Sequence, residues 1–312
     1  MRVLVAGAGG AVGRQLLPPL VRAGHQVTGT TRFQSRAEEI RDAGAEPVIV
    51  DVTELAALRE VVTAARPEVV VNELTSLPEA LNYRDKEALE PTNRLRREVG
   101  PELALMAAEA GARRLVVQSV AFFYAPTGQS LKTEEDPVME IPADSPLSGG
   151  PPALRALEES ALGTRGLDGL VLRYGYFYGP GTYFAPDGSS FRRVRRRRFP
   201  IVGNGRGIFS FIHVEDAAAA TLAAVERGAP GIYNITDDEP APMNEWLPFY
   251  AEAIGAKPPL RVPSWLAQVV AGEEAASLAT RLRGASNAKA KRELGWAPRY
   301  PSWRQGFREA LG

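Results

Sequence analysis

The chain has 312 residues, no cysteine and only two histidines, His25 and His213. Without cysteine there can be no disulfide, no thiolate catalysis and no cysteine-ligated metal. Two histidines are also too few for a histidine-rich metal site, so we expect no metal centre. Any chemistry must therefore come from hydroxyl or carboxylate oxygens, from lysine or arginine, or from an organic cofactor.

The chain also lacks net charge, because 37 basic residues balance 37 acidic ones. No global field draws the protein to nucleic acid or to an anionic membrane. The apolar run in residues 1–10 is broken by glycines within six residues, so it is neither a signal peptide nor a membrane span. We expect a cytoplasmic protein with a small-molecule substrate and with neither nucleic acid nor membrane as a partner.

Short apolar runs alternate with helix-like segments in the first 175 residues. The runs predict six strands, within residues 2–6, 25–32, 46–52, 67–74, 113–120 and 168–175. The segments between them predict helices at 13–23, 35–43, 54–65, 93–110 and 153–162. This alternation indicates an α/β fold, a doubly wound parallel sheet (Rossmann fold) that binds ligands at the carboxyl ends of its strands.

The pattern changes after residue 175 to loops rich in glycine, proline and tyrosine, mixed with short helices. We interpret this part as a smaller C-terminal α+β substrate-binding layer. The expected division assigns residues 1–175 and about 205–230 to the dinucleotide-binding domain. Residues of about 176–204 and 231–312 then form the substrate-binding domain.

A glycine-rich loop follows the first predicted strand and leads directly into a helix. Gly7, Gly10 and Gly13 allow a tight turn, close approach of the backbone to a pyrophosphate, and close packing of the helix on the strand. Ala11 and Val12 lie between the last two glycines, at the helix N-terminus that faces the anion. These five residues are the predicted pyrophosphate site, and an ordinary glycine-rich turn is the alternative.

The second predicted strand ends in Thr31 and Arg32, and Arg36 follows shortly after. In NAD-binding sheets a carboxylate usually binds the ribose 2′-hydroxyl at this place. Hydroxyls and guanidiniums without a carboxylate suit a 2′-phosphate better. We therefore favour NADP over NAD; the alternative is that both arginines are solvated and paired with Glu38 and Glu39.

Asp51 and Val52 end the third predicted strand. A carboxylate followed by an apolar side chain suits the exocyclic amine and the ring face of adenine. Asp51 can equally cap the helix that starts near residue 54.

At this point the chain resembles the extended short-chain dehydrogenases/reductases, the NAD-dependent epimerase/dehydratase group. The resemblance covers nearly the whole length. It rests on the G-x-x-G-x-x-G spacing, Asp51-Val52, Gln118-Ser119 through Tyr124, and the stretches 172–181, 211–216, 233–235 and 287–298.

The resemblance implies a catalytic Tyr-x-x-x-Lys pair at the start of the fifth helix, and this pair is missing. Alignment on Glu159 puts Pro151 at the tyrosine position and Arg155 at the lysine position, and no tyrosine or lysine occurs between Lys132 and Tyr174. Arg155 cannot act as a base, but it can bind the nicotinamide ribose or a substrate anion.

The hydroxyl that the family uses after the fifth strand is also displaced. Val120 stands at the position of the catalytic serine or threonine, and Ser119 matches its structural neighbour. Three side chains remain as candidate catalytic residues: Tyr124 as a substitute proton donor, Glu73 after the fourth strand, and Ser119. The alternative for Glu73 is an ion pair with Arg94 or Arg97.

The substrate is expected between the sheet edge and the C-terminal layer, where aromatic residues are concentrated. Tyr178 and Tyr183 are the candidate substrate-binding residues, although aromatics on strands are more often core. Residues 192–198, RRVRRRR, form a local basic patch. A solvated helix face is the favoured interpretation; a bound diphosphate is the alternative.

Two functions of different classes follow. The first is an NAD(P)-dependent oxidoreductase or epimerase/dehydratase-like enzyme that acts on a carbonyl or alcohol, including sugar-type substrates, with a non-standard proton donor. The second is a catalytically inactive NAD(P)-binding regulatory protein. The resemblance also implies a homodimer formed through the fourth and fifth helices.

Overall fold

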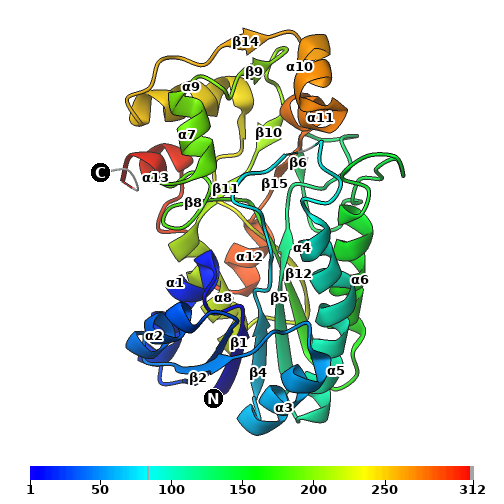
Figure 1. Ribbon diagram of the computed structural model, residues 1–312, viewed down its shortest axis with the longest axis vertical. Helices are drawn as coiled ribbons and strands as arrows, with labels where there is room; N and C mark the ends of the chain where they lie inside the picture. The colour runs from blue at the N-terminus through cyan, green and yellow to red at the C-terminus, as the bar shows by residue number, and fades with distance from the viewer. Residues whose placement is uncertain (83, 310–312) are drawn as a thin grey trace.

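A parallel sheet of seven strands forms the centre of the computed structural model, which describes residues 1–82 and 84–309 (Figure 1). Its spatial order is β12-β7-β5-β4-β1-β2-β3. The strands are β1 (Arg2–Ala6), β2 (Gln26–Thr31), β3 (Glu46–Ile49), β4 (Val69–Asn72), β5 (Arg114–Val120), β7 (Asp168–Tyr174) and β12 (Gly231–Ile235). The prediction of a doubly wound parallel sheet is confirmed, and β12 adds a strand that the sequence pattern did not reveal.

Helices cover both faces of this sheet. They are α1 (Ala11–Arg22), α2 (Gln34–Asp42), α3 (Leu55–Ala65), α4 (Glu90–Arg94), α5 (Gly100–Glu109), α6 (Gly150–Gly163) and α8 (Val214–Glu226). Strand β1 shows why helices are needed on both faces. Val3 and Val5 belong to one core, with α1 and α8, whereas Leu4 and Ala6 belong to a second core, with α3, α5 and α6. Alternate side chains of a strand point to opposite faces, so each face needs its own apolar cover.

The predicted helix 93–110 is three elements rather than one. Helix α4 continues into a π-helical turn, η1 (Leu95–Val99), and then into α5. Pro101 lies in the first turn of α5 and has no N–H to donate to the preceding turn, which favours a change in the hydrogen-bond pattern here. The π turn changes which side of the helix the arginines at 94, 96 and 97 occupy.

The C-terminal part forms a layer over the carboxyl ends of the sheet strands (Figure 1). Its helices are α7 (Ser189–Arg195), α9 (Met243–Ala253), α10 (Ser264–Ala271), α11 (Glu273–Arg281) and α13 (Trp303–Glu309); α12 (Ala288–Glu293) packs against β12. Two-stranded pairs complete it: β8 (Tyr176–Tyr178) with β11 (Phe211–His213), β9 (Ile201–Val202) with β14 (Arg261–Val262), β10 (Ile208–Phe209) with β13 (Ala241–Pro242), and β6 (Leu131–Lys132) with β15 (Gly284–Ala285).

An aromatic core separate from the two sheet cores holds this layer together. Phe211 contacts both Trp246 and Phe307 edge to face, with ring centroids 5.2 and 5.3 Å apart. The division into two domains stays a prediction, but its boundary at residue 230 must move beyond Ile235, since β12 is part of the main sheet.

None of the helices in the described ranges is long and apolar enough to cross a membrane. No group of three or more histidine, aspartate or glutamate side chains in those ranges could hold a metal ion.

Candidate active site

A cavity of about 870 Å³ lies where the carboxyl edge of the sheet meets the C-terminal layer. One end is lined by Ala11 and Arg14 at the start of α1, by Arg32 just after β2, and by Arg36 in α2. The other end is lined by Leu89, Arg96, Phe123 and Leu147. A long cavity that begins at the glycine loop and ends beyond the sheet edge has the arrangement needed for a dinucleotide and a second molecule.

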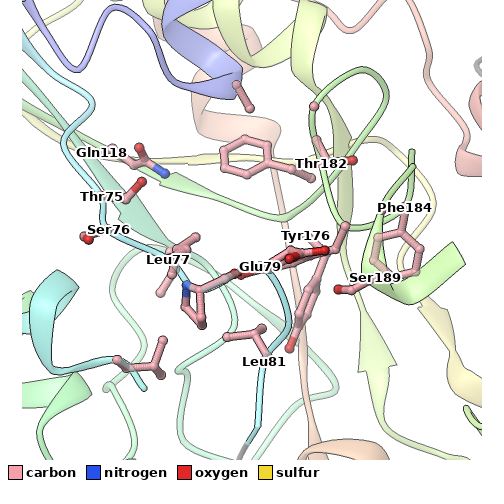
Figure 2. Close-up of a pocket in the computed structure, with 18 of the residues that line it drawn as sticks. Thr75, Ser76, Leu77, Glu79, Leu81, Gln118, Tyr176, Thr182, Phe184 and Ser189 are labelled. Carbon is pink, nitrogen blue, oxygen red and sulfur yellow. The ribbon is translucent and has the colours of Figure 1, made fainter. Parts of the chain in front are cut away.

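Polar side chains lie on both of two facing walls of this cavity. Figure 2 shows Thr75 and Gln118 beside each other on one side, and Thr182, Phe184 and Ser189 on the other. Thr75 follows β4 and Gln118 is in β5, two neighbouring strands of the sheet. The strand ends therefore supply the hydroxyl and amide groups of one wall.

The glycine loop has the close packing that its sequence predicts. Gly7 has a φ of 90°, and a Cβ on it would lie 2.7 Å from the carbonyl oxygen of Glu73. A Cβ on Gly13 would lie 2.5 Å from the carbonyl oxygen of Gly7. Helix α1 has no side-chain cap at Gly10, which leaves its first N–H groups available to an anion. The loop thus fits a pyrophosphate at the positions predicted for Gly7, Gly10, Gly13, Ala11 and Val12.

Three arginines gather at the end of the cavity beside the loop. Arg32 packs over the Phe33 ring at 4.9 Å, and Arg36 donates to Glu39 at 2.5 and 2.7 Å. Arg14, which sequence reasoning missed, lies 3.8 Å from the same Glu39 carboxylate. Three guanidiniums and one carboxylate leave this corner with a positive charge that suits a phosphate.

Three residues predicted to bind the cofactor near this corner, Thr31, Asp51 and Val52, make hydrogen bonds or packing contacts within the protein itself. Thr31 is buried, and its hydroxyl accepts a hydrogen bond from the Phe33 N–H at 3.2 Å. Asp51 is exposed, and its carboxylate accepts from the N–H and hydroxyl of Thr53 at 2.9 and 2.7 Å, which lowers the pKa of Asp51. Val52 packs against the core between the sheet and α3. Asp51 thus forms a turn with Thr53 and does not cap α3, whose N-cap residue is Glu54 without a side-chain hydrogen bond.

The end of β5 turns Ser119 away from the cavity. Gln118 and Val120 line the cavity, whereas the Ser119 hydroxyl is fully buried and donates to Glu158 Oε1 at 2.6 Å. Successive side chains of a strand point to opposite faces, so only one set can reach the cavity. This corrects the expectation that Ser119 offers a hydroxyl to the substrate.

Tyr124 belongs to the same buried network. Its hydroxyl donates to Asn234 Oδ1 at 2.7 Å and accepts from Arg173 Nη1 at 3.1 Å. Arg173 also donates to both carboxylate oxygens of Glu158, at 2.8 and 2.5 Å. Tyr124 is 2% exposed and does not line the cavity, and burial raises the pKa of its hydroxyl. The prediction that Tyr124 points into the cleft is therefore corrected: it ties β7 to β12.

Glu73 lies beneath the glycine loop rather than in the cavity. The Tyr174 hydroxyl donates to its Oε1 at 3.1 Å, and burial raises the pKa of Glu73 to about 8. The alternative of an ion pair with Arg94 or Arg97 is wrong, since Arg94 pairs with Glu98 and Arg97 with Glu90. Glu73 is thus a mainly protonated acid inside the fold at neutral pH.

Helix α6 presents a different residue to the interior than the sequence alignment indicates. Glu159 and Arg155 are exposed, whereas Leu154 and Glu158 are buried. Arg155 does not line the cavity, which corrects its predicted contact with the nicotinamide ribose. Alignment on the buried acid moves the two family positions to Gly150 and Leu154, and neither residue is a tyrosine or a lysine.

The two tyrosines predicted to bind substrate lie in different places. Tyr178 is fully buried in the aromatic core, against Phe211 and Phe307, which corrects its predicted role. Tyr183 lines the cavity, and its hydroxyl donates to the carbonyl oxygen of Pro78 at 2.7 Å. Tyr176 also lines the cavity but was missed; it stacks on Phe122 at 4.4 Å.

The basic run 192–198 contributes one residue to the cavity. Arg192 lines the cavity and pairs with Glu79 at 2.6 Å. Arg193 and Arg195 pack over the rings of Phe199 and Phe191. Three arginines of the run, Arg192, Arg193 and Arg195, thus contact acidic or aromatic side chains of the protein.

Comparisons with known proteins find similarity to NAD dependent epimerases and dehydratases and to a reductase. The model of the NAD dependent epimerase/dehydratase family matches residues 3–236. A Streptomyces protein named 3-diazoavenalumate denitrifying reductase is 44% identical over 309 residues, 98% of this chain and 99% of that protein. A human epimerase family protein, SDR39U1, solved with NADPH, has a TM-score of 0.76 at 20% identity and covers 100% of this chain and 99% of its own. Thermus thermophilus UDP-glucose 4-epimerase, solved with NAD, has a TM-score of 0.75 at 23% identity, with coverage of 100% and 98%.

Proposed function

Because the chain belongs to the NAD-dependent epimerase/dehydratase family, we propose that it is an NADP-dependent reductase of a small molecule that carries a diazo group. The coarser statement, a nicotinamide-dependent oxidoreductase or epimerase, follows from the family. The diazo substrate is taken from the name of the Streptomyces relative, which is alike over nearly the whole of both chains.

A single observation carries the choice of reaction: among the described residues that line the cavity there is no lysine to accompany a tyrosine. Val120 lines the cavity at the end of β5, and Leu147 lines it just before α6. Reduction of a ketone needs a proton on oxygen, whereas loss of nitrogen from a protonated diazo compound needs none. The reaction best suited to these residues is therefore one in which the protein donates no proton.

When bound, the nicotinamide cofactor would supply the hydride that replaces dinitrogen on the carbon bearing the diazonium group, with NADPH as the two-electron donor and NADP⁺ and dinitrogen as the other products. The protein orients the reactants and excludes water. The glycine loop would hold the pyrophosphate, and Arg14, Arg32 and Arg36 would hold the 2′-phosphate. Thr75 and Gln118 offer polar groups to the substrate from the sheet edge.

Carbonyl or alcohol chemistry is the second candidate. The hydroxyls of Thr75, Ser76 and Tyr183 line the cavity, and any of them can serve as a non-standard proton donor. Tyr124, Glu73 and Ser119 remain proposals for that role; it requires the network around Glu158 to open for Ser119 and Tyr124, and the contact with Tyr174 to open for Glu73. A dinucleotide-binding regulator without turnover is the remaining alternative.

The reaction is tested with NADPH and an aromatic diazonium compound, measured above the rate of the protein-free mixture. We expect one dinitrogen released for each NADPH oxidised, and deuterium from the 4-deuterated cofactor on the carbon that lost nitrogen. In Ser119→Ala and Tyr124→Phe, dinitrogen should still be released as NADPH is oxidised. Oxidation of NADPH with ketones but not with the diazonium compound would favour the second candidate instead.

The preference for NADP is tested at Arg32. Arg32→Ala should raise the dissociation constant for NADPH about tenfold, because one charge-assisted contact to a phosphate is worth about 1.5–3 kcal/mol. NADH, which has no 2′-phosphate, should bind as before. The matched control is Arg41→Ala on the exposed side of α2. An equal loss of affinity for NADPH and NADH in Arg32→Ala would show that Arg32 does not bind the 2′-phosphate.

A further inference from the structure

Arg96 is a half-buried guanidinium in the cavity wall at the end away from the glycine loop. It is part of the π-helical turn η1, between α4 and α5. Leu89, Phe123 and Leu147 line the same cavity, so apolar side chains form part of the wall to which Arg96 belongs. A charge in such surroundings requires a partner.

The adjacent arginines have partners, and Arg96 has none among the described residues. Arg94 pairs with Glu98 at 2.8 Å, and Arg97 pairs with Glu90 at 2.6 Å. Within the described ranges, no hydrogen bond or ion pair joins Arg96 to another residue. The π turn thus directs one arginine of three to the cavity and leaves its donors unused.

Glu158 is the carboxylate whose field reaches Arg96, but its oxygens are already engaged. Oε1 accepts from Ser119 and Arg173, and Oε2 accepts from Arg173. Two guanidiniums and one carboxylate leave this part of the interior with one unbalanced positive charge. Burial lowers the pKa of Arg96 to about 10, with Glu158 acting in the opposite direction. A bound anion would balance the charge.

We propose that Arg96 binds the carboxylate of an unsaturated or aromatic acid, which is the substrate of the reductase. This inference rests on the proposed function and adds the substrate class to it. A planar guanidinium binds a carboxylate through two parallel hydrogen bonds. The apolar side chains Leu89, Phe123 and Leu147 suit a flat hydrocarbon body between that carboxylate and the reacting carbon. One unpaired arginine at this end suits a singly charged acid better than the diphosphate of a nucleotide-sugar.

The test compares 4-hydroxycinnamate with its methyl ester, by calorimetry in the presence of saturating NADP⁺. The pair differs in the negative charge of the carboxylate and in one methyl group, so the loss of the difference in Arg96→Met is what assigns it to the charge. We expect the acid to bind about 30-fold more tightly than the ester, and Arg96→Met to remove that difference by weakening the acid alone. Arg96→Lys should restore part of it, since a point charge replaces the planar fork.

Arg97→Met is the matched control, because Arg97 lies in the same turn but pairs with Glu90. It should leave the affinity for the acid unchanged. Arg96→Met should keep its affinity for NADPH and unfold at no lower temperature than the parent, because it removes a half-buried charge that has no partner among the described residues.

Equal affinity for acid and ester, no binding of the acid, or equal loss of both ligands in Arg96→Met would overturn the proposal. These outcomes are separate from a failure of the proposed function. If only the proposed function fails, the acid still binds through Arg96, but NADPH is not oxidised with a diazonium compound.

Discussion

Replacing Glu158 by glutamine is expected to lower the free energy of unfolding by about 3–5 kcal/mol, because it leaves the Arg173 guanidinium buried without its counter-charge. The two side chains are 10% and 6% exposed, and their closest nitrogen and oxygen are 2.5 Å apart. Ser119 would lose its carboxylate acceptor as well. Urea denaturation followed by circular dichroism measures the change.

The control for this variant is Glu98→Gln, which removes the carboxylate of an exposed ion pair with Arg94. Exposed pairs contribute little, so no measurable change is expected. The double variant Glu158→Leu/Arg173→Met should be more stable than either single replacement, since it removes both charges together. A loss below about 1 kcal/mol in Glu158→Gln would mean that the buried pair is not what holds β5, β7 and α6 together.

Gly13→Ala is expected to weaken NADPH binding about 100-fold, equivalent to the loss of one or two charge-assisted hydrogen bonds of about 1.5–3 kcal/mol each. The added Cβ would lie 2.5 Å from the Gly7 carbonyl oxygen and 2.7 Å from that of Ala8. Both contacts are with backbone, which cannot move aside as a flexible side chain can. Helix α1 must therefore shift away from the loop, and its N–H groups move with it.

The control is Gly163→Ala at the end of α6, where an added Cβ meets nothing within 4 Å. NADPH binding should be unchanged there, and stability equal or slightly higher, because alanine favours the helix. Fluorescence titration of NADPH measures both variants. Normal affinity in Gly13→Ala would show that the pyrophosphate does not depend on the close packing of α1 on the loop.

The parts of the fold that could be predicted are those determined by a short stretch of sequence. Alternating apolar runs identify six strands of the sheet, and Gly7 and Gly13 identify the loop because a side chain at either position would collide with backbone. Strand β12 was not predicted, because its sequence, GIYNI, begins with a glycine and contains an asparagine, so it lacks the apolar run that identifies the other six strands.

The predictions that failed in the site depended on orientation. Glu158 and Glu159 are both acids, and one position along a helix rotates a side chain by about 100°. Choosing the exposed one moved the alignment to Arg155 instead of Leu154. In the same way Ser119 and Tyr124 follow the correct strand, but their side chains face a buried network whose members Arg173 and Asn234 come from distant segments.

Arg96 was missed for a third reason, the π turn between α4 and α5. A π turn closes its hydrogen bonds over five residues instead of four, so the two helices differ in rotational phase. Each helix keeps its own buried face on the core, as Thr92 in α4 and Leu103 in α5 show, while the side chain at position 96 does not have to follow the spacing of either helix. The side chain at this position is therefore free to change during evolution without moving either helix. A change of the proposed carboxylate-binding side chain at this turn would therefore leave the packing of the scaffold unchanged.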